Sequence, residues 1–260
     1  MAQDTSSTTD LRGRVAVVTG ATRGLGRQTA LALARAGSAV VVVGRSTAAS
    51  PNRLLPGTLE DTERELRDAG ADVLAIPADV SNEADIERIV GATLERFGRC
   101  NLCVNNAAVS FLGPFLDVPV SKWRAALGVN LLGPVMLTQA FLPSMLEQGD
   151  GRVLNLGSGA AFSDNVEQLP YSITKLSLER LTTGLAHQFT ARGIGVNCIR
   201  IDEVVPTEAV TLHAPELQAT ARCTPQQFGE AAAWVLGRPS WFSGMVLTMD
   251  HLRDLGALPR

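Results

Sequence analysis

The chain contains a single tyrosine, Tyr171, together with only three histidines and four cysteines among its 260 residues. The histidines are scattered without the spacing of metal ligands, so we expect no metal site. Four cysteines in a chain of this length do not make the disulfide framework of a small secreted domain, and we expect reduced thiols. Cys100 and Cys103 form one C-x-x-C pair, but Cys103 lies in an apolar stretch and no second pair follows. This favours buried packing over a redox or zinc-binding role.

An excess of charge of one sign is also missing. Subtracting 26 acidic from 23 basic side chains leaves a net charge of −3, without any basic block, so we expect no nucleic-acid partner. The polar start of the chain has no apolar core of a signal peptide, and the apolar run at residues 39–43 is far shorter than the roughly 20 residues of a membrane span. We therefore expect a cytoplasmic protein with no membrane partner.

The content of hydrophobic residues, 45%, is sufficient for one well-buried α/β domain. We expect a disordered lead over residues 1–10 and a single domain over residues 11–260. Short β-branched runs alternate with longer amphipathic stretches, which is typical of a parallel sheet with helices on both faces. Strands are predicted at residues 14–18, 39–43, 73–76, 102–105, 152–156, 195–201 and 245–249. Helices are predicted at residues 25–36, 83–97, 121–147, 171–192 and 225–236. The loops at residues 46–58 and 202–224 are long, which indicates a function or mobility.

Three glycines lie where the first predicted strand turns into the first predicted helix. The run reads Thr19-Gly20-Ala21-Thr22-Arg23-Gly24-Leu25-Gly26. Glycine permits a tight turn and close approach of the backbone to a pyrophosphate, and the free N–H groups of a helix start favour its negative charge. The spacing G-x-x-x-G-x-G differs from the best-known dinucleotide fingerprint, and a plain turn is the alternative. The position after the first strand favours a dinucleotide site.

The residues after this loop bear on the choice of dinucleotide. An NAD site usually has an acidic side chain about 20 residues beyond the glycines, which binds the ribose 2′-hydroxyl, whereas an NADP site has a cation there. No Asp or Glu occurs from Arg27 through Leu59, and the second predicted strand ends at Gly44-Arg45. Arg23 in the glycine loop is a second guanidinium, and such groups can donate two parallel hydrogen bonds to a phosphate. We expect NADP(H); the alternative is that both are solvated loop arginines.

Tyr171 and Lys175 are four residues apart on a predicted helix and therefore share one of its faces. An ammonium group beside a phenol favours the phenolate, so the pair is suited to general acid–base chemistry. The pattern alone is common, and an exposed aromatic beside a solvated lysine is the alternative. Two further residues strengthen the catalytic interpretation: Ser158 follows the fifth predicted strand, and Asn130 lies earlier in the chain.

In their order and spacing these motifs resemble those of the short-chain dehydrogenase/reductase family, from about Leu11 to Asp250. Residues 19–26 resemble its nucleotide loop, Asp79-Val80 its adenine contact, and Asn105-Asn106-Ala107-Ala108 its Asn-Asn-Ala-Gly segment. Asn130, Ser158, Tyr171 and Lys175 fall where the family has its catalytic tetrad.

The resemblance implies a Rossmann-like, doubly wound parallel sheet of seven strands in the order 3-2-1-4-5-6-7. It implies hydride transfer between the nicotinamide of NADP(H) and a small carbonyl or secondary alcohol substrate. In these roles Tyr171 is the general acid and base, Ser158 orients the carbonyl oxygen, and Lys175 holds the nicotinamide ribose. Asn130 positions a water. The expected cofactor contacts are Gly20, Thr22, Arg23, Gly24, Leu25, Gly26, Arg45, Asp79, Val80, Asn106, Ala107, Lys175 and Val204. The two long helices imply a homodimer or homotetramer.

The chain departs from the family pattern slightly at Ala108, in the Asn-Asn-Ala-Gly segment, and more strongly at two other places. Ile201-Asp202 stands where the family usually has Pro-Gly, and Asp250-His251-Leu252 replaces a frequent Asp-Gly-Gly. These departures leave open the lid over the site and the packing of the C-terminus. Segments expected to line the pocket are mainly apolar, which suits a lipophilic substrate. Two alternatives remain open: a catalytically silent NADP sensor, and non-redox chemistry on the same fold.

Overall fold

The computed structural model describes residues 9–163 and 166–260. Its strands are β1 (Val15–Thr19), β2 (Ala39–Gly44), β3 (Val73–Pro77), β4 (Leu102–Asn105), β5 (Gly151–Ser158), β6 (Ile194–Ile201) and β7 (Val246–Thr248). All neighbouring strands pair in parallel, and their order in the sheet is β3-β2-β1-β4-β5-β6-β7. The predicted topology is therefore confirmed. The lead expected over residues 1–10 lies almost wholly outside the described residues; Asp10 is described, and it pairs with Arg12 at 2.7 Å.

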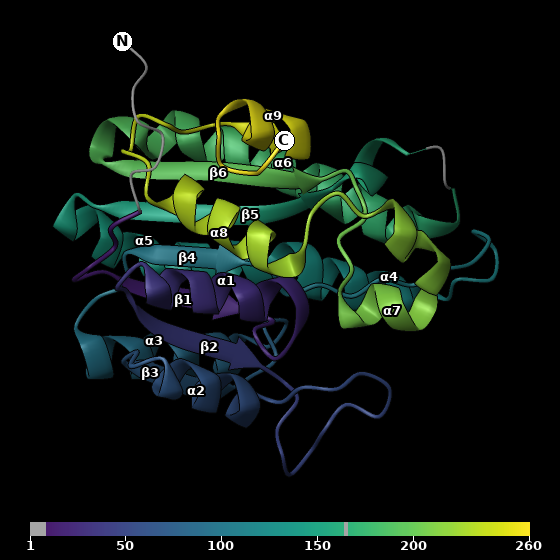
Figure 1. Ribbon diagram of the computed structural model, residues 1–260, viewed down its shortest axis with the longest axis horizontal. Helices are drawn as coiled ribbons and strands as arrows, with labels where there is room; N and C mark the ends of the chain where they lie inside the picture. The colour runs from purple at the N-terminus through teal and green to yellow at the C-terminus, as the bar shows by residue number, and fades with distance from the viewer. Residues whose placement is uncertain (1–8, 164–165) are drawn as a thin grey trace.

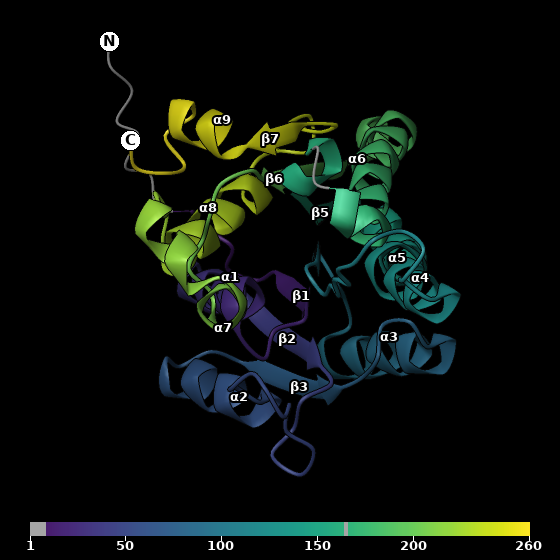
Figure 2. The same ribbon diagram turned by 90° about the vertical axis from the view of Figure 1, so that its right-hand side faces the viewer.

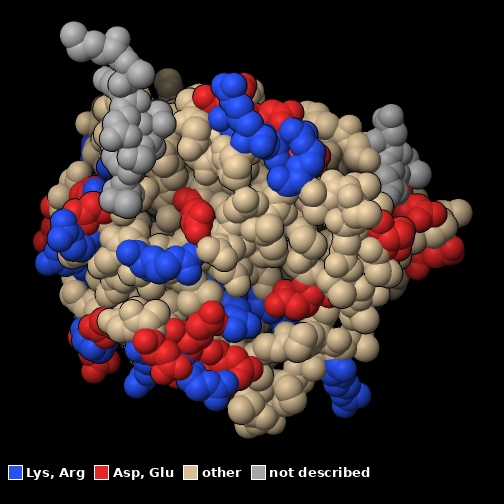
Figure 3. All heavy atoms as spheres, in the orientation of Figure 1, with Lys and Arg blue, Asp and Glu red and all other residues tan. Residues whose placement is uncertain are grey.

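Helices cover both faces of the sheet (Figures 1 and 2). The α-helices are α1 (Gly24–Arg35), α2 (Leu59–Asp68), α3 (Glu83–Phe97), α4 (Val120–Leu127), α5 (Gly133–Gln148), α6 (Leu169–Phe189), α7 (Glu208–His213), α8 (Pro225–Leu236) and α9 (Met249–Asp254). A π-helical turn, η1 (Gly128–Leu132), joins α4 to α5, and short 3₁₀ turns are η2 (Gly159–Phe162), η3 (Val166–Gln168), η4 (Thr190–Arg192) and η5 (Pro215–Thr220). On the face shown in Figure 3, basic and acidic side chains lie next to one another.

The core has two layers because the central strands are buried on both faces. In β1 every residue is buried, and alternate residues enter opposite layers. One layer joins the sheet to α1, α2, α8 and α9, and the other joins it to α3, α5 and α6. This explains why the strands read as unbroken apolar runs instead of alternating with polar residues. The carboxyl ends of the parallel strands then meet at one edge, where sites of open α/β sheets form.

Helix α2 is absent from the sequence prediction because its sequence is strongly polar. Only Leu59, Thr62 and Leu66 of its residues are buried, so the helical period rests on three positions. Its start is fixed by a capping box, in which Thr58 Oγ1 accepts from Asp61 N at 3.2 Å and Asp61 Oδ2 accepts from Thr58 N at 3.1 Å. The capping pair of Thr58 and Asp61 was the signal in the sequence from which the start of this helix could have been predicted.

The long helix predicted at residues 121–147 is interrupted. The π-helical turn η1 separates α4 from α5, and such turns are frequent at functional sites. An 18-residue window within Val120–Gln148 is apolar enough to cross a membrane, with a mean hydropathy of 1.5. Leu137, Phe141 and Met145 are fully buried against the sheet, however, so packing in the core accounts for part of this hydropathy.

Candidate active site

The glycine loop after β1 closes directly onto the residues that follow β4. Gly20 has a φ of +66°, and a Cβ there would lie 2.8 Å from Asn106 Nδ2 and 2.9 Å from the Cα of Ala107. A Cβ on Gly26 would collide with the same amide and with the Gly20 carbonyl. Asn106 Nδ2 in turn donates to Thr19 O at 2.6 Å and to Gly20 O at 3.1 Å. The two predicted motifs are thus parts of one unit, and both glycines are required by close approach.

The start of α1 is free to receive an anion. Arg23 occupies the N-cap position but makes no capping hydrogen bond with its side chain. Its guanidinium donates instead to the carbonyls of Pro56 at 2.7 Å and Gly57 at 2.9 Å, and to Ser46 Oγ at 3.0 Å. Because no side chain caps the first turn, its N–H groups and its dipole are available to a pyrophosphate. This feature fits a dinucleotide.

A groove of about 360 Å³ lies at this edge of the sheet. Most of the predicted cofactor contacts line it, namely Gly20, Thr22, Arg23, Gly24, Leu25, Gly26, Arg45, Asp79, Val80, Asn106 and Ala107. Two predicted contacts, Lys175 and Val204, are not among its lining residues. Lining residues that the sequence prediction missed include Ser46, Asn52, Leu55, Thr207 and Glu208. Ser46 could have been predicted to line the groove because it follows Arg45 directly. Glu208 could not, because only the path of the chain after β6 brings it to the groove.

Two charged residues at the ends of β2 and β3 face each other across this groove. Arg45 Nη1 lies 3.2 Å from Asp79 Oδ2. Burial acts to raise the pKa of Asp79, but hydrogen bonds from Ser81 and the nearby Arg45 outweigh it, so the pKa is lowered. Asp79 is therefore a carboxylate near neutral pH and orients Arg45 from one side. The Arg45 side chain remains 61% exposed, which leaves its other donors open to a ligand.

The four tetrad residues come from β5, η1 and α6. Ser158 is the last residue of β5, and its Oγ accepts from Ala160 N at 3.2 Å. Tyr171 lies in the first turn of α6 and is half-buried. Lys175 follows one turn later and is only 3% exposed. Its Nζ donates to Leu156 O at 2.6 Å and lies 5.4 Å from the centre of the Tyr171 ring.

Asn130 is connected to α6 through its side-chain amide. Its Oδ1 accepts from Val109 N at 2.8 Å, and its Nδ2 donates to Val109 O at 2.8 Å and to Thr174 Oγ1 at 3.1 Å. Thr174 Oγ1 donates to the Tyr171 carbonyl at 2.7 Å. The π-helical turn therefore aims a fully buried amide at the backbone of the helix that carries Tyr171 and Lys175.

The C-x-x-C pair is fully buried in the core layer that contains α3 and α5. Burial raises the pKa of Cys103 to about 12 and that of Cys100 well above its usual range. A thiol in such surroundings stays protonated, and it is the thiolate that reacts and binds metals. The geometry agrees with a packing role for both residues.

Comparisons with known proteins place this geometry in a family. The family model described as short chain dehydrogenase matches residues 14–214. The chain belongs to the short-chain dehydrogenase family. A 3-oxoacyl-(acyl-carrier-protein) reductase from Synechocystis is 32% identical over 191 residues, which cover 74% of this chain and 74% of the relative.

Two solved structures extend the comparison to the whole sheet. A metagenomic short-chain oxidoreductase in complex with NADP has a TM-score of 0.77 and 28% identity, and the match covers 92% of this chain and 97% of that one. Levodione reductase has a TM-score of 0.81 and 26% identity, with coverage of 94% and 98%. Membership makes this short-chain dehydrogenase an oxidoreductase that acts on a small molecule with a nicotinamide cofactor.

Proposed function

We propose that this short-chain dehydrogenase interconverts a carbonyl and a secondary alcohol on a small lipophilic substrate, with NADP(H) as cofactor and Tyr171 as general acid and base. The observation that carries the proposal is the buried ammonium of Lys175 beside Tyr171. Within the described part of the chain, no Asp or Glu forms an ion pair with this ammonium, and its hydrogen bond goes to the Leu156 carbonyl. A buried charge without a partner opposes folding. Its retention points to a function.

The chain's own residues divide the chemistry between them. When bound, the nicotinamide ring supplies or accepts the hydride. Tyr171 donates its hydroxyl proton to the oxygen of the carbonyl during reduction and takes it back during oxidation. The Ser158 hydroxyl, at the end of β5, hydrogen-bonds the same oxygen and stabilises the charge that develops there. Lys175 presents its remaining N–H donors to the cofactor ribose and to the phenol, and Asn130 positions a water behind α6.

The preference for NADP(H) rests on the end of β2. Arg45 lines the groove with donors exposed, and no acidic residue occurs between Arg27 and Leu59 to accept a ribose 2′-hydroxyl. Arg23 contributes less directly, since two of its nitrogens already hold the loop at residues 46–58. Among the relatives, the metagenomic oxidoreductase is in complex with NADP.

An apolar substrate is favoured by the exposed side chains around the site. Phe162 is the last residue of η2, which follows Ser158, and it is exposed. Leu112, Phe115 and Leu116, in the loop between β4 and α4, are exposed as well. We place the enzyme in the cytoplasm as a homodimer or homotetramer built on its long helices, in keeping with the symmetric oligomers common among soluble enzymes. Light scattering that finds only monomers at micromolar concentration would remove the oligomer from the proposal.

The test of the proposed function is NADPH oxidation over a panel of carbonyl compounds, with two lysine variants alongside. The sequence contains only two lysines, Lys175 and the exposed Lys122. Lys175→Met should remove most of the turnover without lowering the melting temperature, because it deletes a buried unpaired charge. Lys122→Met should leave both unchanged. NADPH binding without turnover of any compound would favour the sensor. A Lys175→Met variant with a lowered melting temperature and the specific activity of the wild type would contradict the assigned role.

A further inference from the structure

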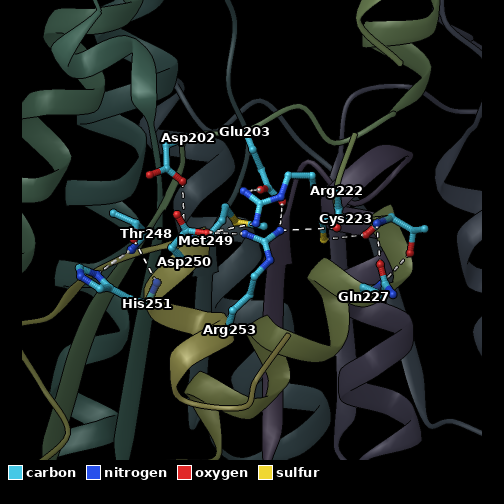
Figure 4. Close-up of polar contacts among 11 residues, drawn as sticks. Asp202, Glu203, Arg222, Cys223, Gln227, Thr248, Met249, Asp250, His251 and Arg253 are labelled. Carbon is cyan, nitrogen blue, oxygen red and sulfur yellow. Dashed lines mark hydrogen bonds and ion pairs between the residues drawn. The ribbon is translucent and has the colours of Figure 1, made fainter. Parts of the chain in front are cut away.

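The segment at residues 202–224, here called the lid segment, connects β6 to α8, and both of its ends lie beside α9 (Figure 4). It follows β6 directly and ends where Thr224 caps α8. At its start, Asp202 Oδ1 accepts from Met249 N at 3.0 Å, at the first residue of α9. Asp202 of the first departure from the family pattern therefore contacts the residue directly before the second departure, Asp250-His251-Leu252. A glycine at position 202 would leave this N–H without its carboxylate.

Arg253 of α9 contacts both ends of the lid segment with one guanidinium (Figure 4). Its Nη2 donates to Glu203 Oε1 at 2.6 Å, near the start, and to Arg222 O at 3.5 Å, near the end. Its Nη1 donates to Asp250 Oδ1 at 2.9 Å. The planar, forked guanidinium is suited to joining several acceptors at once, which a lysine ammonium cannot do with the same geometry.

Burial separates the strong part of this cluster from the weak part. The side chains of Arg253 and Glu203 are 6% and 12% exposed, whereas that of Asp250 is 72% exposed. Arg222 adds longer ion pairs, at 3.9 Å to Glu203 and 3.6 Å to Asp250, from a solvent-exposed position. The hydrogen bond to Glu203 raises the pKa of Arg253. The Glu203–Arg253 pair therefore dominates, because screening by solvent weakens exposed pairs.

Little else holds the lid segment in place. Val205 and Cys223 are buried in the core at its two ends. Between them, none of residues 206–222 is buried. This middle part contains α7 and η5, and it brings Thr207 and Glu208 to the groove, where a Cβ on Gly24 would lie 3.5 Å from Thr207 Cγ2. The position of these groove residues thus depends on how the two ends are fixed.

We propose that Arg253 is a positioning residue that closes the base of the lid segment and thereby holds Thr207 and Glu208 over the glycine loop. It touches neither substrate nor cofactor. The effect on cofactor binding rests on the proposed function, since it assumes that the groove binds NADP(H). The effect on the lid segment itself does not depend on the proposed function.

Hydrogen exchange of the ligand-free protein tests the clamp directly. In Arg253→Met, amides of residues 206–221 should exchange about tenfold faster or more, with those of β1 and β4 unchanged, because the local opening becomes easier while the sheet stays intact. The KM for NADPH should rise about tenfold with kcat within about twofold, since the competent lid position is less populated. The exchange rates and the KM for NADPH of Arg253→Lys should lie between those of Arg253→Met and the wild type, because lysine keeps the charge but loses the forked guanidinium.

Arg152 provides the matched control. It lies at the start of β5, at the edge of the sheet opposite the carboxyl ends of the strands. Its side chain is 8% exposed, pairs with Asp150 at 3.2 Å and donates to Arg238 O at 2.8 Å. Arg152→Met should lower the melting temperature while leaving exchange at residues 206–221 and the KM for NADPH unchanged. If Arg253→Met fails to fold, Glu203→Gln keeps an acceptor, removes the charge and should act in the same direction with a smaller effect.

Two results would overturn the proposal. One is exchange at residues 206–221 that matches the wild type in both Arg253→Met and Glu203→Gln. The other is faster exchange with an unchanged KM for NADPH, which would show that the lid segment does not position groove residues. A wild-type protein that binds no NADPH would refute the proposed function instead, and the exchange measurement would then decide the clamp alone.

Discussion

Replacing Arg45 with alanine should weaken NADPH binding about tenfold and leave NADH binding unchanged. A hydrogen bond to a charged group contributes roughly 1.5–3 kcal/mol. The Arg45 side chain is 61% exposed and shared with Asp79 at 3.2 Å, so solvent and the carboxylate both compete for its donors. This places its contribution near the lower end, about 1.5 kcal/mol, which corresponds to about tenfold in Kd. NADH has no 2′-phosphate, so its affinity should not change when Arg45 is replaced.

The assay is a titration of each dinucleotide followed by nicotinamide fluorescence, at two salt concentrations. The difference between the variant and the wild type should shrink at high salt, because an exposed ion pair is screened. Arg53→Ala is the matched control, since Arg53 is an exposed arginine in the loop at residues 46–58, which follows Arg45, and does not line the groove. Arg45→Asp should erode or reverse the preference for NADPH. Equal weakening of NADPH and NADH in Arg45→Ala, or an equal effect of Arg53→Ala, would refute the assignment.

Gly20→Ala should lower the melting temperature and weaken NADPH binding more than Gly13→Ala does. Both glycines have positive φ, but a Cβ would meet atoms within 4 Å only at Gly20. Equal effects of the two substitutions would contradict the close-approach argument. Asn130→Ala should reduce the free energy of unfolding by about 1–3 kcal/mol in urea titrations, since it removes one buried hydrogen bond and two partly buried ones. The stability of the wild type should fall as pH rises from about 9 to 12, because the unfolded Cys103 thiol ionises near 9.0 while burial raises its folded pKa to about 12. Urea unfolding of Cys103→Ala should show a weaker fall.

The sequence predicted the sheet well because its strands are short apolar runs separated by turns and long helices. It missed α2, α7 and α9, and the physical reasons are clearest for α2 and α9. α2 has few buried positions, and α9 is a six-residue helix whose capping box uses His251 in place of an acidic or amide side chain. Periodicity is too weak a signal for either. Their boundaries are instead set by side chains that bond to the backbone at the first turn.

The site was predictable where motifs are local, and less so where distant segments meet. Asn106 and the glycines of the loop after β1 line the groove, and each belongs to a motif with its own local pattern. That Arg23 holds the loop at residues 46–58 depends on the Pro56 and Gly57 carbonyls, which no sequence pattern indicates. The contact between Glu203 and Arg253, 50 residues apart, likewise exists only in the folded chain.

The most direct test of the central claim is the turnover of Tyr171→Phe on a confirmed carbonyl substrate, together with its NADPH affinity. The protein has no other tyrosine, so no second phenol can take over the proton transfer. We predict a Kd for NADPH within about twofold of the wild type and a kcat lower by about 10²–10⁴-fold, because the substitution removes the proton donor and little else. Near-normal turnover in the phenylalanine variant would contradict the assignment of Tyr171 as the general acid.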